Sequence, residues 1–301
     1  MSLRFLDDKG LYTDYAHYRT HAAWNFDAPK EETYVFHCYW TGALSRHHEL
    51  CLKSLVVTQS LPYEIWLWMP PESVSRSADV LASLASIPML KIREYIPEKE
   101  ARGTVFERRI GILKTGKAAL LSDGLRTLAL LKYGGFYFDL DVLFLRDLRQ
   151  LGAIEFFYPW SNQPYGNSAV LRFRAGKNIQ RVAARSVHIG TCHPARLYRF
   201  ADVGRILDDV YVLPTFAFDP AWLSHDGHAA PHPPCSRFND FFLDETPTTL
   251  ADFFPASYTY HWHNRWDRTI GGHTLAGQLY EEVAARYARL ARTWGSTDDE
   301  S

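Results

Sequence analysis

Two carboxylates lie one residue apart in a segment that is otherwise apolar and aromatic. They are Asp139 and Asp141 in "KYGGFYFDLDVLFLRDL", residues 132–148. In an extended segment side chains alternate between faces, so both carboxylates are expected to point the same way, about 7 Å apart. Like charges are costly in apolar surroundings unless a cation or hydrogen-bond donors meet them. Carboxylate oxygens are the ligands that Mg²⁺ and Mn²⁺ prefer, so the spacing predicts a site for a metal ion and a diphosphate.

The same residues permit two other interpretations. A hydrophobic segment with this spacing at a strand end also resembles the haloacid-dehalogenase-like phosphatases, in which Asp139 would be the nucleophile. Lys177 and the pair Asp208-Asp209 would then complete the site. That family's motif normally lies near the start of its domain and has Thr or Val where this chain has Leu143. In the simplest interpretation, both aspartates only face solvent at a strand end.

The segment just upstream predicts a helix that leads into the aspartates. "KAALLSDGLRTLALLKYGG", residues 117–135, consists of helix formers and ends in two glycines, which is typical of a helix C-terminus. Its leucines form one stripe. Asp123 and Arg126, three residues apart, lie together on roughly the opposite side. Such a pair is ordinary on a helix surface, and it is also suited to reach a ligand.

The rest of the chain alternates strand-like and helix-like segments. Residues 33–40, 63–71 and 89–95 are β-branched, aromatic or apolar runs that predict strands, and a helical pattern separates the first two. This alternation predicts an α/β fold with a sheet whose ligands bind beyond the carboxyl ends of the strands. Residues 277–294 predict a packing helix, followed by a frayed end.

Residues 218–240 are rich in proline, glycine and histidine and predict a long surface loop. Its histidines, His225, His228 and His232, have no cysteine or carboxylate partners at ligand spacing, so we assign them no metal. The four cysteines of the chain are scattered without a CxxC motif, which favours reduced, buried thiols.

Bulk composition narrows the classes of partner. The 301 residues carry a formal net charge of -1, which does not suit a nucleic-acid-binding surface. Asp7 and Asp8 interrupt the start of the chain where a signal peptide needs apolar residues, and no apolar run approaches the roughly 18 residues of a membrane span. We therefore expect a cytoplasmic protein, with peripheral contact at the inner face of the membrane as an open alternative.

A family resemblance favours the first interpretation of the aspartates. Residues 122–148 resemble the "SD-xx-R … (Y)GG-x-Y-x-D-x-D" core of glycosyltransferase family 32 and its relatives. These DXD sugar-binding transferases include α-1,4-galactosyltransferases, initiating mannosyltransferases and the glucosylating domain of large clostridial toxins. Four elements recur in order within about 25 residues, far more than an isolated DxD. Flanking segments agree: "VFHCYWTG" at 35–42, "YGNSAVLRFRAGKN" at 165–178 and "YTYHWHNRW" at 258–266 are similar to the family's first strand, its strand after the DXD and its late histidine segment.

The resemblance implies a metal site and a role for each aspartate. Asp141 would coordinate Mn²⁺ or Mg²⁺, and Asp139 would bind the ribose or the donor sugar and reach the metal through water. Both are the candidate catalytic residues. His261 would be a further ligand of the metal or of the diphosphate.

The resemblance also implies the residues that bind the substrate. Trp40 would stack on the nucleotide base, Asp123 and Arg126 would contact the donor's sugar and its ribose or base, and Asn167 would complete the substrate-binding set.

The implied fold is the α/β GT-A type of nucleotide-diphospho-sugar transferase, with a Rossmann-like mixed central sheet flanked by helices. We expect a lead-in at residues 1–32, the transferase domain at 33–276, and a C-terminal helix and tail at 277–301. The donor-binding half would span about 33–148 and the acceptor half about 149–276.

The implied function is a retaining, metal-dependent transfer of a hexose or N-acetylhexosamine from a nucleotide-sugar, expected to be UDP-linked, to a glycan or glycolipid acceptor. Surface polysaccharide synthesis is the expected setting, and nucleic acid is not an expected partner. The phosphatase and a non-catalytic glycan-binding module of the same fold remain the alternatives.

Overall fold

The computed structural model describes residues 3–6, 24, 26, 33–60, 62–114, 116–226 and 235–294. Its centre is an eight-stranded sheet in which β8 alone runs antiparallel to its neighbours. A short antiparallel pair, β6 (Val142–Phe144) and β10 (Thr259–His261), lies beside it. The predicted α/β fold with a mixed central sheet is confirmed. The order across the large sheet is β1 (Leu3–Phe5), β9 (Val210–Val212), β7 (Phe156–Pro159), β8 (Gly166–Phe173), β5 (Gly135–Phe138), β2 (Tyr34–Tyr39), β3 (Tyr63–Met69), β4 (Leu90–Glu94).

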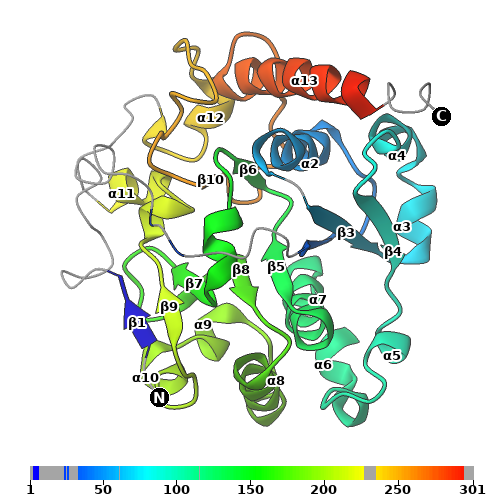
Figure 1. Cartoon of the computed structure of the whole chain (residues 1–301), viewed down its shortest axis with the longest axis vertical. Helices are drawn as coiled ribbons and strands as arrows, with labels where there is room; N and C mark the ends of the chain where they lie inside the picture. The colour runs from blue at the N-terminus through cyan, green and yellow to red at the C-terminus, as the bar shows by residue number, and fades with distance from the viewer. Residues whose placement is uncertain are drawn as a thin grey trace.

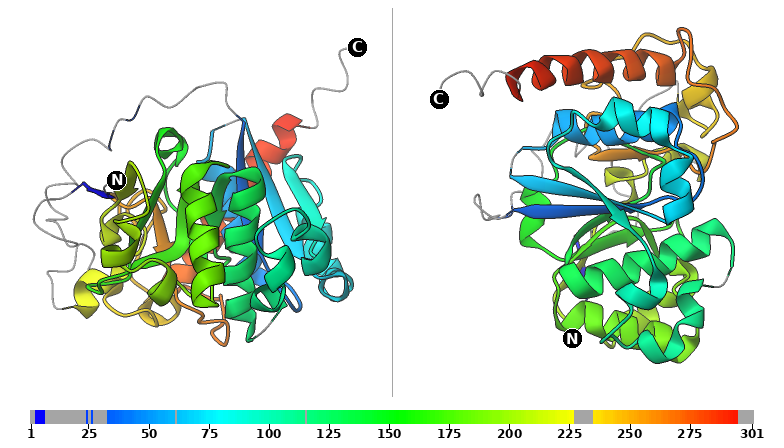
Figure 2. Two further views of the ribbon diagram at one scale, coloured as in Figure 1. Left: turned by 90° about the horizontal axis from the view of Figure 1, so that it is seen from below. Right: turned by 90° about the vertical axis from the view of Figure 1, so that its right-hand side faces the viewer.

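Helices cover both faces of the sheet and make three layers (Figures 1 and 2). One face is covered by α2 (Arg46–Thr58), with α13 (Leu275–Trp294) above it. The opposite face is covered by α7 (Ala118–Tyr133) and α8 (Lys177–Ile189). Shorter helices connect these elements: α3 (Pro71–Ser75), α4 (Ala78–Leu84), α5 (Pro97–Glu100), η1 (Glu107–Arg109), α6 (Gly111–Lys114), η2 (Arg149–Ala153), α9 (Pro194–Leu197), α10 (Phe200–Val203), η3 (Thr215–Ala217), α11 (Ala221–His225), α12 (Asp240–Leu243).

The central strands are buried on both faces, as their continuous apolar sequences predict. In β2, Phe36 and Cys38 belong to the hydrophobic cluster under α2, whereas Tyr39 belongs to the cluster under α7. Strand side chains alternate between faces, so a strand between two helical layers needs apolar residues at nearly every position. The sheet thereby separates two cores and leaves its strand ends free to carry polar groups.

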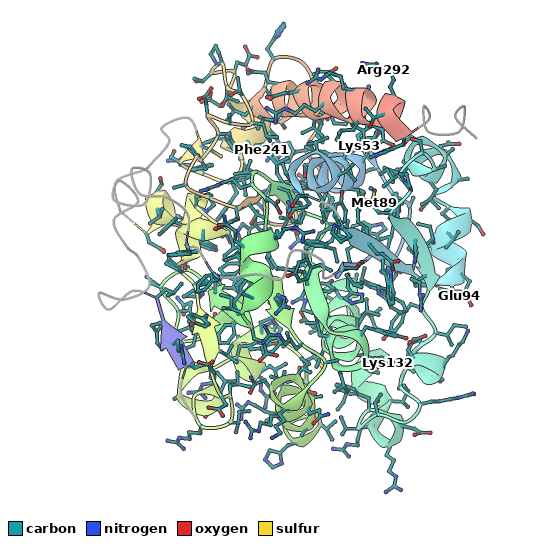
Figure 3. The ribbon with its side chains drawn as sticks, in the orientation of Figure 1. Lys53, Met89, Glu94, Lys132, Phe241 and Arg292 are labelled. Atoms are coloured by element: carbon teal, nitrogen blue, oxygen red, sulfur yellow. The ribbon has the colours of Figure 1, made fainter. Side chains whose placement is uncertain are left out.

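Helix α13 is held on α2 by apolar packing and by polar contacts at its edge. The Tyr280 hydroxyl donates to Glu49 at 2.8 Å, and the Lys53 ammonium lies 4.8 Å from the centre of the Tyr287 ring. Figure 3 shows Lys53 between these two helices. The predicted C-terminal helix is confirmed. No helix among the described residues is long and apolar enough to cross a bilayer.

Residues 218–240 are only partly the loop that we expected. Helix α11 ends at His225, whose ring packs against Trp222 and Phe238. Residues 227–234, with His228 and His232, lie outside the described part of the chain, as do most of residues 1–32 and the tail after Trp294. All four cysteines are buried free thiols, as predicted. The division into lead-in, domain halves and tail stays a prediction.

His37 shows how β2 is tied to the turn that starts β5. The buried ring accepts a hydrogen bond from the Trp68 indole at Nδ1, 3.1 Å, and its Nε2 lies 2.9 Å from the Gly134 carbonyl oxygen. Only the neutral ring with a proton on Nε2 satisfies both contacts. Burial lowers the pKa of His37 to about 4, since the charged form is poorly solvated there.

The pKa of His37 predicts a pH-dependent loss of stability. The unfolded ring binds a proton near its ordinary value of 6.5 and the folded ring near 4, so the stabilisation is complete above pH 6.5 and is lost as the pH falls towards 4. His37 alone should lower the free energy of unfolding by about 2 kcal/mol between pH 7.5 and pH 5. Urea unfolding of the wild type and His37→Gln at both pH values measures the difference. His273→Gln, at an exposed histidine, is the control, and equal pH slopes in all three proteins would contradict the assignment.

Candidate active site

A pocket of about 350 Å³ lies at the carboxyl ends of the parallel strands. Trp40 follows β2, Asp139 follows β5, and Ser122 lies in the first turns of α7. Because β8 runs in the opposite direction, its first residues, including Asn167, reach the same edge. Ligands of open α/β sheets bind at this edge. The other polar or aromatic side chains in the wall are Tyr39, Thr41, Asp123, Arg126, Asp141, Trp160, Ser168, His193, His261, His263, Asn264 and Trp266.

The two aspartates lie in a turn and not along one strand, so this part of the prediction was wrong. Strand β5 ends at Phe138 and β6 begins at Val142. The backbone N–H of Asp139 still donates to Ala169 of β8 at 2.8 Å, and the chain then turns at residues 140–141. Both aspartates line the pocket, but the turn brings them there and not the alternation of a strand.

Arg126 neutralises Asp139 from the buried side. One terminal nitrogen of its guanidinium lies 2.7 Å from Oδ1 of Asp139, and the other lies 3.0 Å from Oδ1 of Asp123 and also donates to Ser168. Asp123 and Arg126 are both buried, so the predicted pair turns inwards between α7 and β8. A planar guanidinium can serve several acceptors at fixed angles, and Arg126 uses this to join α7, β5 and β8.

Burial dominates the acid chemistry of this side of the pocket. It raises the pKa of Asp123 to about 6, although the neighbouring Arg126 opposes the rise. Burial and the nearby Asp141 also raise the pKa of Asp139, again against the pull of Arg126. Without Arg126, the buried Asp123 and the half-buried Asp139 would lack their cation.

Asp141 contacts a segment that lies more than a hundred residues later in the chain. In the β6–β10 pair, His261 is opposite Val142, and the N–H of Trp262 donates to the Asp141 carbonyl at 3.0 Å. His263 and Asn264 follow with φ of 52° and 56°, a left-handed turn that aims the N–H of Asn264 at Oδ2 of Asp141, 2.7 Å away. Nε2 of His261 lies 3.1 Å from the same oxygen.

The charges of Asp141 and His261 support each other. Burial alone would raise the pKa of Asp141, but His261 and the N–H of Asn264 lower it to about 2. Burial alone would lower the pKa of His261, but Asp141 on one side and Asp219 on the other raise it well above its ordinary value. His261 is therefore a cation between two carboxylates when no metal is bound.

Asp219 and His263 belong to the site and were missed from the sequence. Oδ2 of Asp219 lies 3.4 Å from Nδ1 of His261 and 2.8 Å from Nε2 of His263. Asp219 lies in the segment that we expected to be a surface loop, and His263 lies in the late histidine segment, where we assigned a role to His261 alone. No spacing rule connects a carboxylate with histidines about forty residues later. Hydrogen bonds from residues 257–259 to the backbone of residues 216–218 bring them together.

These donors fit a divalent metal ion. Asp139 and Asp141 offer carboxylate oxygens to the pocket and His261 offers an imidazole nitrogen, a donor set that suits Mn²⁺. They are the residues that would hold such an ion. Among the described residues, the group of three that brings one ligand atom each to within 4.8 Å of one another is Asp219, His261 and His263.

Aromatic rings form one wall of the pocket. Trp40 is half-buried, with its ring centre 4.7 Å from that of Trp266 and 4.1 Å from that of His48. Its position in the wall agrees with the proposed contact to a base, which itself stays a prediction. The chain after β6 contributes one more ring to the pocket, that of Trp160. Phe157, three residues earlier, is buried in the core.

Asn167 presents an unsatisfied donor. Its Oδ1 accepts a hydrogen bond from the N–H of Ala169 at 2.9 Å, which fixes the amide. Its Nδ2 is buried and has no hydrogen-bond partner among the described residues. Buried polar atoms are seldom left in that state, so this group is available to a bound ligand.

The phosphatase interpretation fails on topology. Asp139 follows the end of β5, whereas Lys177 begins α8 after the end of the antiparallel β8, and Asp208-Asp209 come just before β9. Phe173 at the end of β8 pairs with Gly135 at the start of β5. The two groups therefore lie at opposite edges of the sheet and do not form one site.

Residues 47–158 match the family model described as the glycosyltransferase sugar-binding region containing DXD motif. The match covers α2 through β7 and includes Asp123, Arg126 and both aspartates. This region therefore resembles the sugar-binding region of the DXD-containing glycosyltransferases, and the resemblance seen in the sequence is confirmed over these residues.

Solved structures of glycosyltransferases resemble the fold at low identity. The glycosyltransferase GlyE of Streptococcus pneumoniae TIGR4 is 14% identical, with a TM-score of 0.49 over 88% of this chain and 64% of that chain. The galactosyltransferase LgtC, in complex with donor and acceptor sugar analogs, is 14% identical, with a TM-score of 0.46 over 88% and 98%. The PaToxG glycosyltransferase is 15% identical, with a TM-score of 0.44 over 58% and 68%. No curated protein sequence matches the chain.

The buried position of Arg126 predicts a large cost for its removal. Arg126→Met leaves Asp123 as a buried carboxylate and Asp139 as a half-buried one without their cation, which should lower the free energy of unfolding by about 3–5 kcal/mol at pH 8. The cost should shrink as the pH falls towards about 6, because loss of Arg126 raises the pKa of Asp123 above that value and protonated Asp123 needs no cation. Urea unfolding at several pH values measures both effects.

Arg286→Met is the matched control for Arg126→Met. Arg286 pairs with Glu282 on the surface of α13, with side-chain exposures of 36% and 26%. Such a pair is worth about 0–1 kcal/mol. Equal costs for the two variants would show that Arg126 does not neutralise the site.

Proposed function

We propose that the protein is a metal-dependent, retaining glycosyltransferase that moves a hexose or N-acetylhexosamine from a UDP-sugar to a hydroxyl of a glycan or glycolipid. The observation that carries this proposal is the convergence of Asp139, Asp141 and His261 in one pocket beside the ring of Trp40. A nucleotide-sugar presents a base, a diphosphate and a sugar, and the wall of the pocket offers a group for each.

The chemistry to be catalysed is departure of a diphosphate from the anomeric carbon. When bound, Mn²⁺ or Mg²⁺ would supply the positive charge that stabilises this leaving group. Asp139, Asp141 and His261 would hold the ion. Arg126 already forms ion pairs with Asp123 and Asp139, so its role is to keep Asp139 ionised and oriented.

The remaining groups bind and orient the donor. Trp40 would stack on the base, and the free Nδ2 of Asn167 would donate to a hydroxyl or phosphate oxygen. Asp123 would accept from a sugar hydroxyl. Retention of configuration follows the family resemblance, and we propose attack from the front face, with no covalent intermediate on the protein.

We propose cytoplasmic synthesis of surface polysaccharides as the setting. An acceptor carried on a lipid would bring the enzyme to the inner face of the membrane as a peripheral protein. The proposal rests on the sequence-based expectation of a chain without a membrane span.

The proposed activity is tested by release of UDP. With Mn²⁺ and a panel of UDP-hexoses and UDP-N-acetylhexosamines, the wild type should release UDP, and Asp141→Ala should reduce the rate at least about 100-fold because it removes charge stabilisation at the leaving group. Asp267→Asn, at a carboxylate whose side chain is 74% exposed, is the control. A rate that survives Asp141→Ala would refute the metal site.

The same protein samples separate an enzyme from a binding module. A thermal shift with UDP and Mn²⁺ but no turnover with any donor would favour a non-catalytic glycan-binding module of this fold. The absence of both a thermal shift and turnover would refute the glycosyltransferase proposal for these donors.

Stacking on Trp40 predicts a selective loss of nucleotide affinity. Trp40→Ala should weaken UDP binding by about 1–3 kcal/mol, since base–aromatic stacking is worth that much. Binding of Mn²⁺ alone should be unchanged because Trp40 is not one of its donors. Calorimetric titration of both ligands measures this, with Trp294→Ala at the end of α13 as the control. Unaltered UDP affinity in Trp40→Ala would place the base elsewhere.

A further inference from the structure

Behind His261 lies a second, fully buried carboxylate that the proposed chemistry does not use. Asp219 has no exposed surface, and it follows η3 on the side of His261 that faces away from Asp141. A buried carboxylate is costly unless it has a defined partner. Both of its oxygens lie within hydrogen-bond distance of His263 Nε2, at 2.8 and 3.0 Å.

His261 is held between the two carboxylates with its nitrogens facing opposite ways. Nε2 faces Asp141 at 3.1 Å and Nδ1 faces Asp219 at 3.4 Å. The ring cannot turn freely, because the His263 ring is stacked on it with the centres 3.8 Å apart and the planes inclined by 26°. A half-turn of the ring would put carbon atoms in place of both nitrogens and break both contacts at once.

The two histidines have different roles in this arrangement. His261 reaches the pocket between the aspartates and is 6% exposed. His263 adopts the left-handed backbone conformation, with φ of 52°, that sends its side chain back over His261 to Asp219. Few residues other than glycine adopt this conformation without strain, so the contact to Asp219 compensates for a locally unfavourable backbone.

We propose that Asp219 and His263 are positioning residues that hold His261 with its proton on Nδ1 and its Nε2 lone pair directed at the metal beside Asp141. This inference rests on the proposed function, because it assumes that His261 is a metal ligand. A histidine that binds a metal commonly donates its other N–H to a carboxylate, which fixes the ring and makes the ligating nitrogen more basic.

The arrangement predicts which metal the site prefers. Imidazole nitrogen is a better ligand for Mn²⁺ than for Mg²⁺, whereas carboxylate oxygens accept both. A well-oriented His261 should therefore favour Mn²⁺, and its disorientation should remove that preference. A general loss of stability would weaken the binding of both ions equally, so the ratio of the Mn²⁺ and Mg²⁺ affinities reports only the orientation of His261.

The experiment compares Mn²⁺ and Mg²⁺ binding to the full chain by calorimetry in the presence of UDP. Asp219→Asn should weaken Mn²⁺ binding about 10–100-fold, the usual effect of losing such a partner, and should weaken Mg²⁺ binding much less. His261→Ala should lose the same preference for Mn²⁺. His263 lies at the pocket wall, so His263→Gln carries a smaller risk of misfolding than Asp219→Asn. This variant should change the ratio of the Mn²⁺ and Mg²⁺ affinities in the same direction. His273→Gln, at an exposed histidine, should leave it unchanged.

Two outcomes would overturn the inference while the proposed function stands. One is a wild-type preference for Mn²⁺ that survives in folded Asp219→Asn and His263→Gln, with thermal unfolding as the check on folding. The other is that the wild type binds two Mn²⁺ ions per chain and each of the two variants binds only one. Asp219, His261 and His263 would then ligate an ion of their own. Absence of Mn²⁺ and Mg²⁺ binding to the wild type would instead overturn the metal dependence of the proposed function.

Discussion

Each aspartate of the DXD motif has a buried cation of its own. Arg126 holds Asp139 from the side of α7, and His261 holds Asp141 from the side of β10. Burial raises the pKa of each carboxylate, and its cation lowers that pKa again. The two cations differ in kind, because a guanidinium keeps its proton, whereas an imidazole can exchange one proton for a metal ion. The neutralised pair explains why an otherwise apolar segment carries two charges.

The compensation of these charges depends on the topology of the sheet. Parallel strands bring their carboxyl ends to one edge, and the antiparallel β8 adds its first residues, including Asn167, to that edge. The separate β6–β10 pair then fastens the late histidine segment beside the turn that carries Asp141. Two hydrophobic cores on the two faces of the sheet hold these pieces rigid, and rigidity is what lets polar groups be placed for a ligand.

Much of this could be predicted from the sequence because the signals are local. The strands β2, β3 and β4 and the helices α7 and α13 follow from runs and periodicities within single segments. The DXD aspartates, Asp123 and Arg126 lie within one short motif, so their meeting in one site follows from its helix-to-strand geometry. The family resemblance added Trp40, Asn167 and His261, and all three line the pocket.

The wrong and the missing predictions concern contacts between residues that are far apart in the sequence. The aspartates were placed in a continuous strand, because apolar residues continue on both sides; the turn between β5 and β6 is set by β6 pairing with β10. Asp219 and His263 were missed, since the fold alone brings the loop after η3 against the end of β10. Lys177 and Asp208-Asp209 were candidate partners of Asp139 until the direction of β8 placed them at the far edge.

The sequence by itself determined the α/β class, the DXD region and the identity of most charged groups in the pocket, because those depend on neighbouring residues and on composition. Only the tertiary structure decided which group neutralises which. Partner choice among buried charges is a matter of a few ångströms between segments that fold together, and residue spacing along the chain carries no record of that distance. The position of Asp219 behind His261 is the clearest case, with 3.4 Å between the carboxylate and the imidazole.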